Sequence, residues 1–149
     1  MAARVLITGH GKYASGLLDA INLLSGENNN FTAIDFSGDV KSYQDALTSK
    51  LEEMASEKDT NILVVCDLFG GTPFRTAARI SRTRANVAVA SGINLPGLFH
   101  AAFEMNTASF SDLCNDIIKI SKQSIMLYEK AGYGKHFPTD SISGSKTGI

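Results

Sequence analysis

The chain has 149 residues, of which 44% are hydrophobic and 19% are charged, and its 14 basic and 15 acidic residues give a formal net charge of −1. This size and balance predict one globular domain over residues 1–131, followed by a glycine- and serine-rich tail over 132–149 that is flexible or docks on a partner. The near-neutral charge disfavours nucleic-acid binding, which needs a positive field. No apolar run approaches the roughly 20 residues of a membrane span, and no signal-peptide pattern opens the chain. We therefore expect a cytoplasmic protein.

Short apolar runs alternate with stretches of helical periodicity along the chain. The elements expected, in chain order, are a strand at 4–8, a helix at 15–24, a strand at 31–36, a helix at 43–54, a strand at 62–66, a helix at 72–80, a strand at 86–90, and helices at 95–103 and 109–120. The strand at 62–66 is apolar without alternation, which is typical of a central parallel strand covered on both faces. The repetition predicts an α/β fold: a single-domain, open, doubly wound sheet of about four parallel strands, with room for an added antiparallel edge strand and with helices on both faces.

Two of these helices carry recognisable start signals. Thr72 is expected to be the N-cap of one helix, with Pro73 at its first helical position. Ser109 is expected to cap the last helix, whose inward-facing residues are predicted to be Leu113, Ile117, Ile118 and Ile120.

A candidate site follows from the ends of the strands. Ligands of open parallel α/β sheets bind at the carboxyl ends of the strands, and here those ends deliver His10, Asp67 and the segment 91–94 to one edge. His10 and Asp67 should therefore lie close together. A carboxylate that accepts from Nδ1 fixes the tautomer of an imidazole and leaves Nε2 as a nucleophile. No metal or cofactor is expected.

The loops around this pair have the composition of a phosphate site. Glycines leave backbone amides accessible, and the start of a helix adds a positive N-terminal end and, here, a hydroxyl. The residues expected to bind phosphate are Gly11, Gly70, Gly71 and Thr72.

Three motifs together resemble a known family. The segments Ile7–Gly11 (ITGHG), Asp67–Phe74 (DLFGGTPF) and Gly92–Pro96 (GINLP) are similar, in order and spacing, to motifs of the IIA component of the mannose-type sugar phosphotransferase system. The resemblance covers residues 1–131. In that family a serine often precedes the proline of the second motif, and Thr72 keeps its hydroxyl here.

The resemblance implies a function and a set of partners. The small carrier protein HPr would phosphorylate His10 on Nε2, and His10 would pass the phosphoryl group to a histidine of a IIB component, with Asp67 in support. The membrane components IIC and IID would select the sugar, so the protein would associate peripherally with a transporter complex. Relatives form homodimers that exchange a short edge strand, and the sequence past Lys130 shows no evident counterpart of that strand.

An alternative function is dinucleotide binding. Gly9, Gly11 and Ala14 match the G-x-G-x-x-[GA] pattern after a strand, and Asp35 stands about 20 residues further on. Against this reading, a single domain leaves no room for a substrate domain, and the segment 67–73 would have no role. A non-enzymatic module that senses phosphorylation is a third class, and it would not need His10.

Other reactive or charged residues have ordinary explanations. Cys66 lies in the most apolar strand and is expected to be an unreactive core thiol. His100 is expected to pack within its helix rather than bind a ligand. A local basic cluster is either a solvated face or a surface that steers an acidic partner, with Arg75 and Arg79 as the candidates for partner binding; its members are Arg75, Arg79, Arg82 and Arg84.

Overall fold

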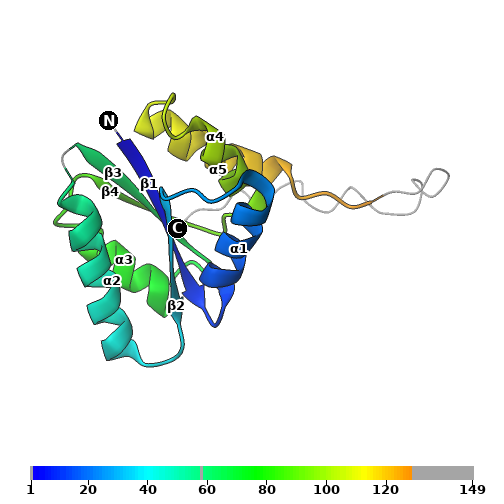
Figure 1. The fold of residues 1–149 in the computed structure, drawn as a ribbon. Coiled ribbons are helices and arrows are strands. Elements are labelled where there is room, and N and C mark those ends of the chain that lie inside the picture. The colour runs from blue at the N-terminus through cyan, green and yellow to red at the C-terminus, as the bar shows by residue number, and fades with distance from the viewer. Residues whose placement is uncertain (1, 58, 129–149) are drawn as a thin grey trace, which may run out of the picture.

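The computed structural model describes residues 2–57 and 59–128 (Figure 1). Its strands are β1 (Ala2–His10), β2 (Phe31–Phe36), β3 (Thr60–Cys66) and β4 (Val87–Ser91), and its helices are α1 (Tyr13–Ser25), α2 (Val40–Ala55), α3 (Thr72–Ser81), α4 (Leu95–Glu104) and α5 (Phe110–Gln123). All strand pairs are parallel, in the order β2-β1-β3-β4. The predicted α/β fold is confirmed. The tail at 132–149, and any exchanged strand past Lys130, lie outside the described residues.

Helices cover both faces of the sheet, as predicted. Successive residues of β1 and β3 point to opposite faces, so that Ile7 and Val65 pack with α1, α4 and α5 while Leu6 and Val64 pack with α2 and α3. Figure 1 shows these two layers on either side of the strands. The continuous apolar run in β3 therefore fills two cores at once. Among the described residues, no helix is both long and apolar enough to cross a membrane.

Two details of the helices differ from the sequence prediction. The N-cap of α3 is Gly71, and Thr72 is already the first helical residue, so the prediction of Thr72 as the cap was wrong by one position. Ser109 does cap α5, since its hydroxyl accepts from the Asp112 amide at 3.1 Å. On α5, Ile117 is buried as predicted, whereas Ile118 is 37% exposed.

The inward face of α5 is set by its close approach to α4. Ser121 is buried one turn after Ile117, and it lies against Gly97 of α4, where a side chain would collide with the Ser121 hydroxyl. Asn94, the N-cap of α4, also donates to the Ser121 carbonyl at 3.0 Å. These contacts turn the helix face that carries Ile117 and Ser121 toward the core, so that Ile118 faces outward.

The strand order creates a switch point at the centre of the sheet. From β1 the chain crosses to β2 on one side, and from β3 it crosses to β4 on the other, which is where ligands bind in sheets of this kind. Thr8 of β1 pairs with Cys66 of β3. The residues just beyond this pair, His10 and Asp67, therefore lie side by side at the carboxyl edge.

Candidate functional site

His10 and Asp67 form a directly hydrogen-bonded pair. One carboxylate oxygen, Oδ2 of Asp67, accepts from the backbone N–H of His10 at 2.8 Å and lies 2.9 Å from Nδ1 of its ring. The other oxygen, Oδ1, accepts from the Leu68 amide at 2.8 Å. The carboxylate is thus fixed at both ends and in turn orients the imidazole.

The electrostatics of the pair favour an ionised Asp67. Partial burial acts to raise its pKa, but the hydrogen bonds from the backbone and ring of His10 and from the Leu68 amide together hold the pKa below its ordinary value. A carboxylate that stays ionised is the form that accepts the Nδ1 proton.

Two glycines leave the space that the pair needs. A Cβ at Gly9 would lie 2.8 Å from Cγ of Asp67, and a Cβ at Gly71 would lie 2.9 Å from Cε1 of His10. Both distances are too short for a side chain. Gly9 therefore makes room for the carboxylate, and Gly71 lets the start of α3 approach the imidazole.

The imidazole presents its second nitrogen outward. The His10 side chain is 45% exposed, and its ring meets the edge of Phe36 at a centroid distance of 5.5 Å. Nδ1 lies at Asp67, and Nε2 has no hydrogen-bond partner among the described residues. A ring held on one side and open on the other is poised to react at Nε2.

The amides around His10 divide into two groups. The N–H of Gly11 donates to the Phe36 carbonyl at 2.9 Å, and that of Gly71 donates to the Leu68 carbonyl at 3.2 Å. These two amides are engaged within the fold, contrary to the expectation that they face a phosphate. The amides of Thr72 and Phe74, in the first turn of α3, donate to no group in the described part of the chain, so they are free to donate to an anion.

Gly11 and Gly70 also contribute through their backbone conformation. Both have positive φ, +59° and +79° respectively, a region that residues with a Cβ adopt with strain. Gly11 turns the chain from β1 into α1, and Gly70 turns the loop after β3 into α3.

Sequence reasoning missed a connection that Tyr13 makes across the site. Its hydroxyl donates to the Ile93 carbonyl at 2.9 Å, which ties the start of α1 to the loop after β4. Burial raises the pKa of Tyr13 to about 12, with the nearby Asp67 adding to the effect. The hydroxyl therefore keeps its proton and serves as a permanent donor.

The residues of the dinucleotide pattern have other roles. Both oxygens of Asp35 accept from Ser15 in α1, Oδ1 from the backbone N–H at 3.0 Å and Oδ2 from the hydroxyl at 2.6 Å. The carboxylate that would hold a ribose is thus committed to the N-terminus of α1. Ala14 is buried in the core, and Gly9 faces Asp67.

The predicted core thiol is confirmed. Cys66 is fully buried, and burial raises its pKa to about 12, with Asp67 contributing. Within the described residues, no group of three His, Cys, Asp or Glu side chains is placed to hold a metal ion.

The arginines of the basic cluster have different surroundings in the structure. Arg75 and Arg79 line a cavity between α2 and α3, whereas Arg84 pairs with Glu52 at 3.2 Å.

Sequence reasoning also missed an apolar surface next to the site: Leu68 and Phe69 are both exposed, the latter to 77%. The sequence did carry a signal for this surface, because two large apolar residues stand directly before Gly70 and Gly71 in a loop.

Comparisons with known proteins agree with the motifs. The family model described as "PTS system fructose IIA component" matches residues 4–118. The chain is 30% identical over 125 residues to the "PTS system fructose-specific EIIA component" of Bacillus subtilis, which covers 83% of this chain and 84% of the relative. It is 31% identical over 129 residues to the "PTS system sorbose-specific EIIA component" of Lacticaseibacillus casei, covering 85% and 91%.

The fold agrees as well. The solved "phosphotransferase system component EIIA" from Streptococcus agalactiae superposes with a TM-score of 0.74 at 26% identity, over 83% of this chain and 95% of that one. The chain therefore belongs to the EIIA family of the mannose-type sugar phosphotransferase system, which includes fructose, sorbose and mannose members.

Proposed function

We propose that this chain is a phosphoryl carrier that accepts a phosphoryl group from phospho-HPr on Nε2 of His10 and passes it to a IIB component during sugar uptake. The observation that carries the proposal is the 2.9 Å contact between Nδ1 of His10 and Oδ2 of Asp67. This contact favours the tautomer that carries its proton on Nδ1, which leaves the lone pair on Nε2 as the nucleophile.

The transfer step requires no proton movement at the attacking nitrogen. The Nε2 lone pair of His10 attacks phosphorus in line with the donor histidine, the donor P–N bond breaks, and its electron pair returns to the donor imidazole. The ring of His10 becomes positively charged, and ionised Asp67 stabilises that charge through Nδ1–H. Transfer to the IIB component reverses these steps with a new acceptor.

The start of α3 supports the phosphoryl oxygens in this proposal. The unpaired amides of Thr72 and Phe74 and the hydroxyl of Thr72 lie at the N-terminal end of a ten-residue helix, which is a favourable place for an anion. Gly71 allows this helix end to approach the ring. Developing negative charge during transfer is thereby met by fixed donors.

The same edge offers a docking surface for the protein partners. Leu68 and Phe69 directly follow Asp67 and are exposed, and Phe69 rests on Phe74 at a ring-centroid distance of 4.6 Å. An exposed apolar pair beside a reactive side chain is typical of a protein-binding surface. We assign it to HPr and the IIB component, and we place the carrier in the cytoplasm beside the membrane components IIC and IID.

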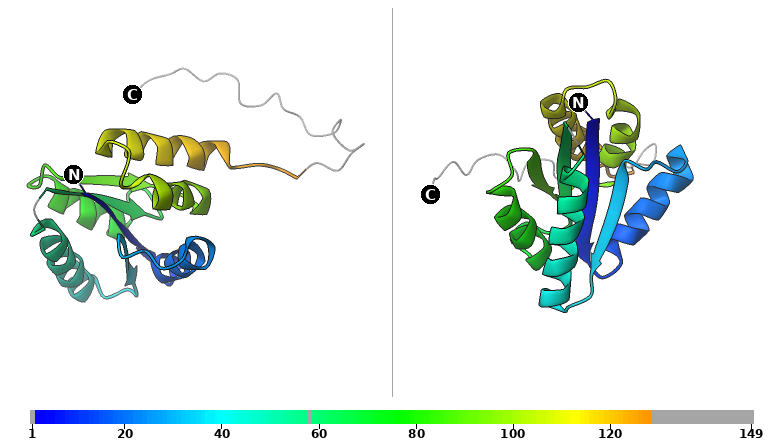
Figure 2. Two further views of the ribbon diagram at one scale, coloured as in Figure 1. Left: turned by 45° about the horizontal axis from the view of Figure 1, so that its top comes forward. Right: turned by 60° about the vertical axis from the view of Figure 1, so that its left-hand side comes forward.

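The proposed carrier is a homodimer. The outer edge of β4 pairs with no strand among the described residues, and a groove of about 230 Å³ runs between β4 and α5. After α5 the chain leaves the body of the molecule (Figure 2, left), and its residues Ile125, Met126, Leu127 and Tyr128 are all exposed. An apolar segment from one protomer and an open strand edge on the other are complementary.

Intact mass after phosphorylation tests the proposed function. Incubation with phosphoenolpyruvate, the general phosphotransferase enzyme and HPr should add one acid-labile phosphoryl group to the wild-type chain and none to His10→Gln. His100→Gln is the matched control, since that histidine lies on α4 away from the carboxyl edge, and it should be labelled like the wild type. Labelling of His10→Gln would reject the proposal.

A further inference from the structure

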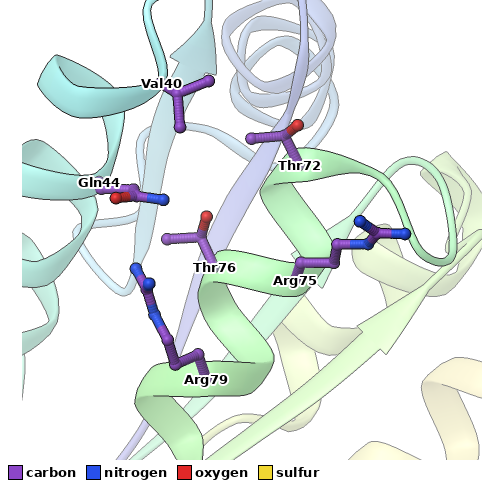
Figure 3. A pocket seen from close by; sticks show the side chains of 6 residues that line it. All are labelled: Val40, Gln44, Thr72, Arg75, Thr76 and Arg79. Atoms are coloured by element: carbon purple, nitrogen blue, oxygen red, sulfur yellow. The ribbon is translucent and has the colours of Figure 1, made fainter.

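A cavity of about 300 Å³ opens between α2 and α3 (Figure 3). Two helices form it, with α2 contributing an apolar and an amide side chain and α3 contributing two hydroxyls and two guanidinium groups. Its lining residues are Val40, Gln44, Thr72, Arg75, Thr76 and Arg79.

The cavity carries uncompensated positive charge. Arg75 and Arg79 stand one turn apart on α3, and neither guanidinium group forms an ion pair or a hydrogen bond with any described residue. The lining contains no carboxylate. By contrast, Arg84 from the same stretch of chain is neutralised by Glu52. Two guanidinium groups left without an acid at one cavity attract an anion.

A threonine of α3 adds a hydroxyl donor to the cavity. Thr76 is only 3% exposed, its hydroxyl makes no hydrogen bond with the described part of the chain, and it points into the cavity (Figure 3). A threonine in a helix commonly satisfies its hydroxyl on the carbonyl one turn back. With no protein partner, the hydroxyl is free to donate to an acceptor bound in the cavity.

The donors define the chemistry of the ligand. Guanidinium N–H groups, two hydroxyls and the Gln44 amide all can donate, which suits the several acceptor oxygens of a phosphate. The cavity is larger than a phosphate group alone, and Val40 with the threonine methyl groups gives it an apolar wall. We propose that this cavity binds a small phosphate monoester, with its phosphate on Arg75, Arg79 and Thr76. The proposal does not depend on phosphorylation of His10.

Titration with glycerol 3-phosphate and with inorganic phosphate, followed by amide NMR, tests the site. Both ligands should shift the α3 amides between Thr72 and Arg79, and the ester should bind more tightly because its carbon body meets the Val40 wall. Glycerol should cause no shifts. Arg79→Gln should weaken ester binding by about tenfold or more, the scale expected for a charge-assisted hydrogen bond.

Two further variants keep the test specific. Arg82→Gln makes the same charge change at the C-cap of α3, outside the cavity lining, and should bind like the wild type. Thr76→Val keeps the side-chain shape, should weaken binding severalfold, and should not lower the melting temperature, because the lost hydroxyl has no partner in the fold.

The phosphoryl site and the cavity are separated by His10→Gln. This variant should bind glycerol 3-phosphate like the wild type; loss of binding would place the phosphate at His10 and overturn the proposal. Absence of ester binding by the wild type would also overturn it. If in that case Arg79→Gln slowed transfer from phospho-HPr, the two arginines would instead belong to the docking of an acidic partner.

Discussion

One carboxylate oxygen of Asp67 contacts His10 at two points: Oδ2 accepts from the backbone N–H at 2.8 Å and lies 2.9 Å from Nδ1 of the ring. The backbone bond fixes the loop and the ring bond fixes the tautomer. The carboxylate thus couples the position of the nucleophile to its protonation state. Its removal should affect chemistry more than folding.

We predict that Asp67→Asn slows phosphorylation by phospho-HPr by about 10- to 100-fold, the usual cost of removing a hydrogen-bonded partner that orients a reactive histidine. The amide oxygen can still accept the His10 backbone N–H, so the fold should persist. The variant loses the negative charge that stabilises the phosphorylated ring. Rapid-quench transfer rates measure the effect, with circular dichroism as the check on folding. A folded variant with the wild-type transfer rate would show that Asp67 has no role in phosphoryl transfer.

The pKa of Asp67 should report its contacts directly. Its folded-state pKa is below the ordinary value, so ionised Asp67 stabilises the folded state above about pH 4, and this contribution is lost as the pH falls through the folded-state pKa. In His10→Ala the ring contact disappears while the backbone contacts stay. We expect the pKa to rise in that variant, measured by carbon-detected NMR titration. An unchanged pKa would mean that the ring does not hold the carboxylate.

Gly71→Ala should impair transfer by displacing the imidazole. The new Cβ would lie 2.9 Å from Cε1 of His10, so the ring must move off Asp67 or α3 must move away from it. Gly16→Ala is the matched control on the exposed face of α1, where a Cβ meets nothing within 4 Å. That control should raise stability by about 0.5–1 kcal/mol, because alanine is the better helix former. Equal transfer rates in both variants would exclude steric displacement.

Much of the architecture was predictable because local signals agreed with the fold. The unbroken apolar run in β3 indicated a strand covered on both faces, and the parallel order brought the loops of β1 and β3 together. The hydrogen bonds of individual amides were not predictable. Gly11 and Gly71 looked like phosphate donors in sequence, yet their N–H groups bond to the Phe36 and Leu68 carbonyls, which depends on loop geometry that composition does not encode.

The same limit applies to surfaces. Helical periodicity places Ile117 and Ile118 on adjacent positions, and the sequence could not indicate that only Ile117 is buried, because the choice depends on how closely Gly97 brings α4 to α5. The cavity between α2 and α3 could not be predicted from the sequence either. Arg75 and Arg79 were visible as a basic pair in the sequence, but the burial of Thr76 beside them depends on how α2 and α3 pack.

Phe69→Ser should weaken recognition of phospho-HPr while leaving the chemical step intact. The side chain is mostly exposed and follows Asp67, which holds the reactive ring, by two residues, so we expect a partner that reaches His10 to cover it. We expect the KM for phospho-HPr to rise by about tenfold, the scale for a truncated aromatic at the centre of an interface, with kcat little changed. Phe103→Ser, an exposed aromatic on α4, is the control and should leave KM unchanged. A fall in kcat alone would place Phe69 in the chemistry instead.

The dimer should depend on the segment after α5. Light scattering should give twice the 15.9 kDa mass of one chain, since the open edge of β4 and the exposed apolar residues 125–128 would otherwise both face water. Met126→Asp introduces a charge into that segment at a side chain that is exposed in the protomer, so it should shift the protein to monomer without unfolding it. Leu23→Asp makes a comparable change on α1, which packs on β1 and β2 at the other side of the sheet, and should leave the dimer intact. Dissociation by both variants would point to a different interface, and a monomeric wild type would remove the dimer from the proposed function.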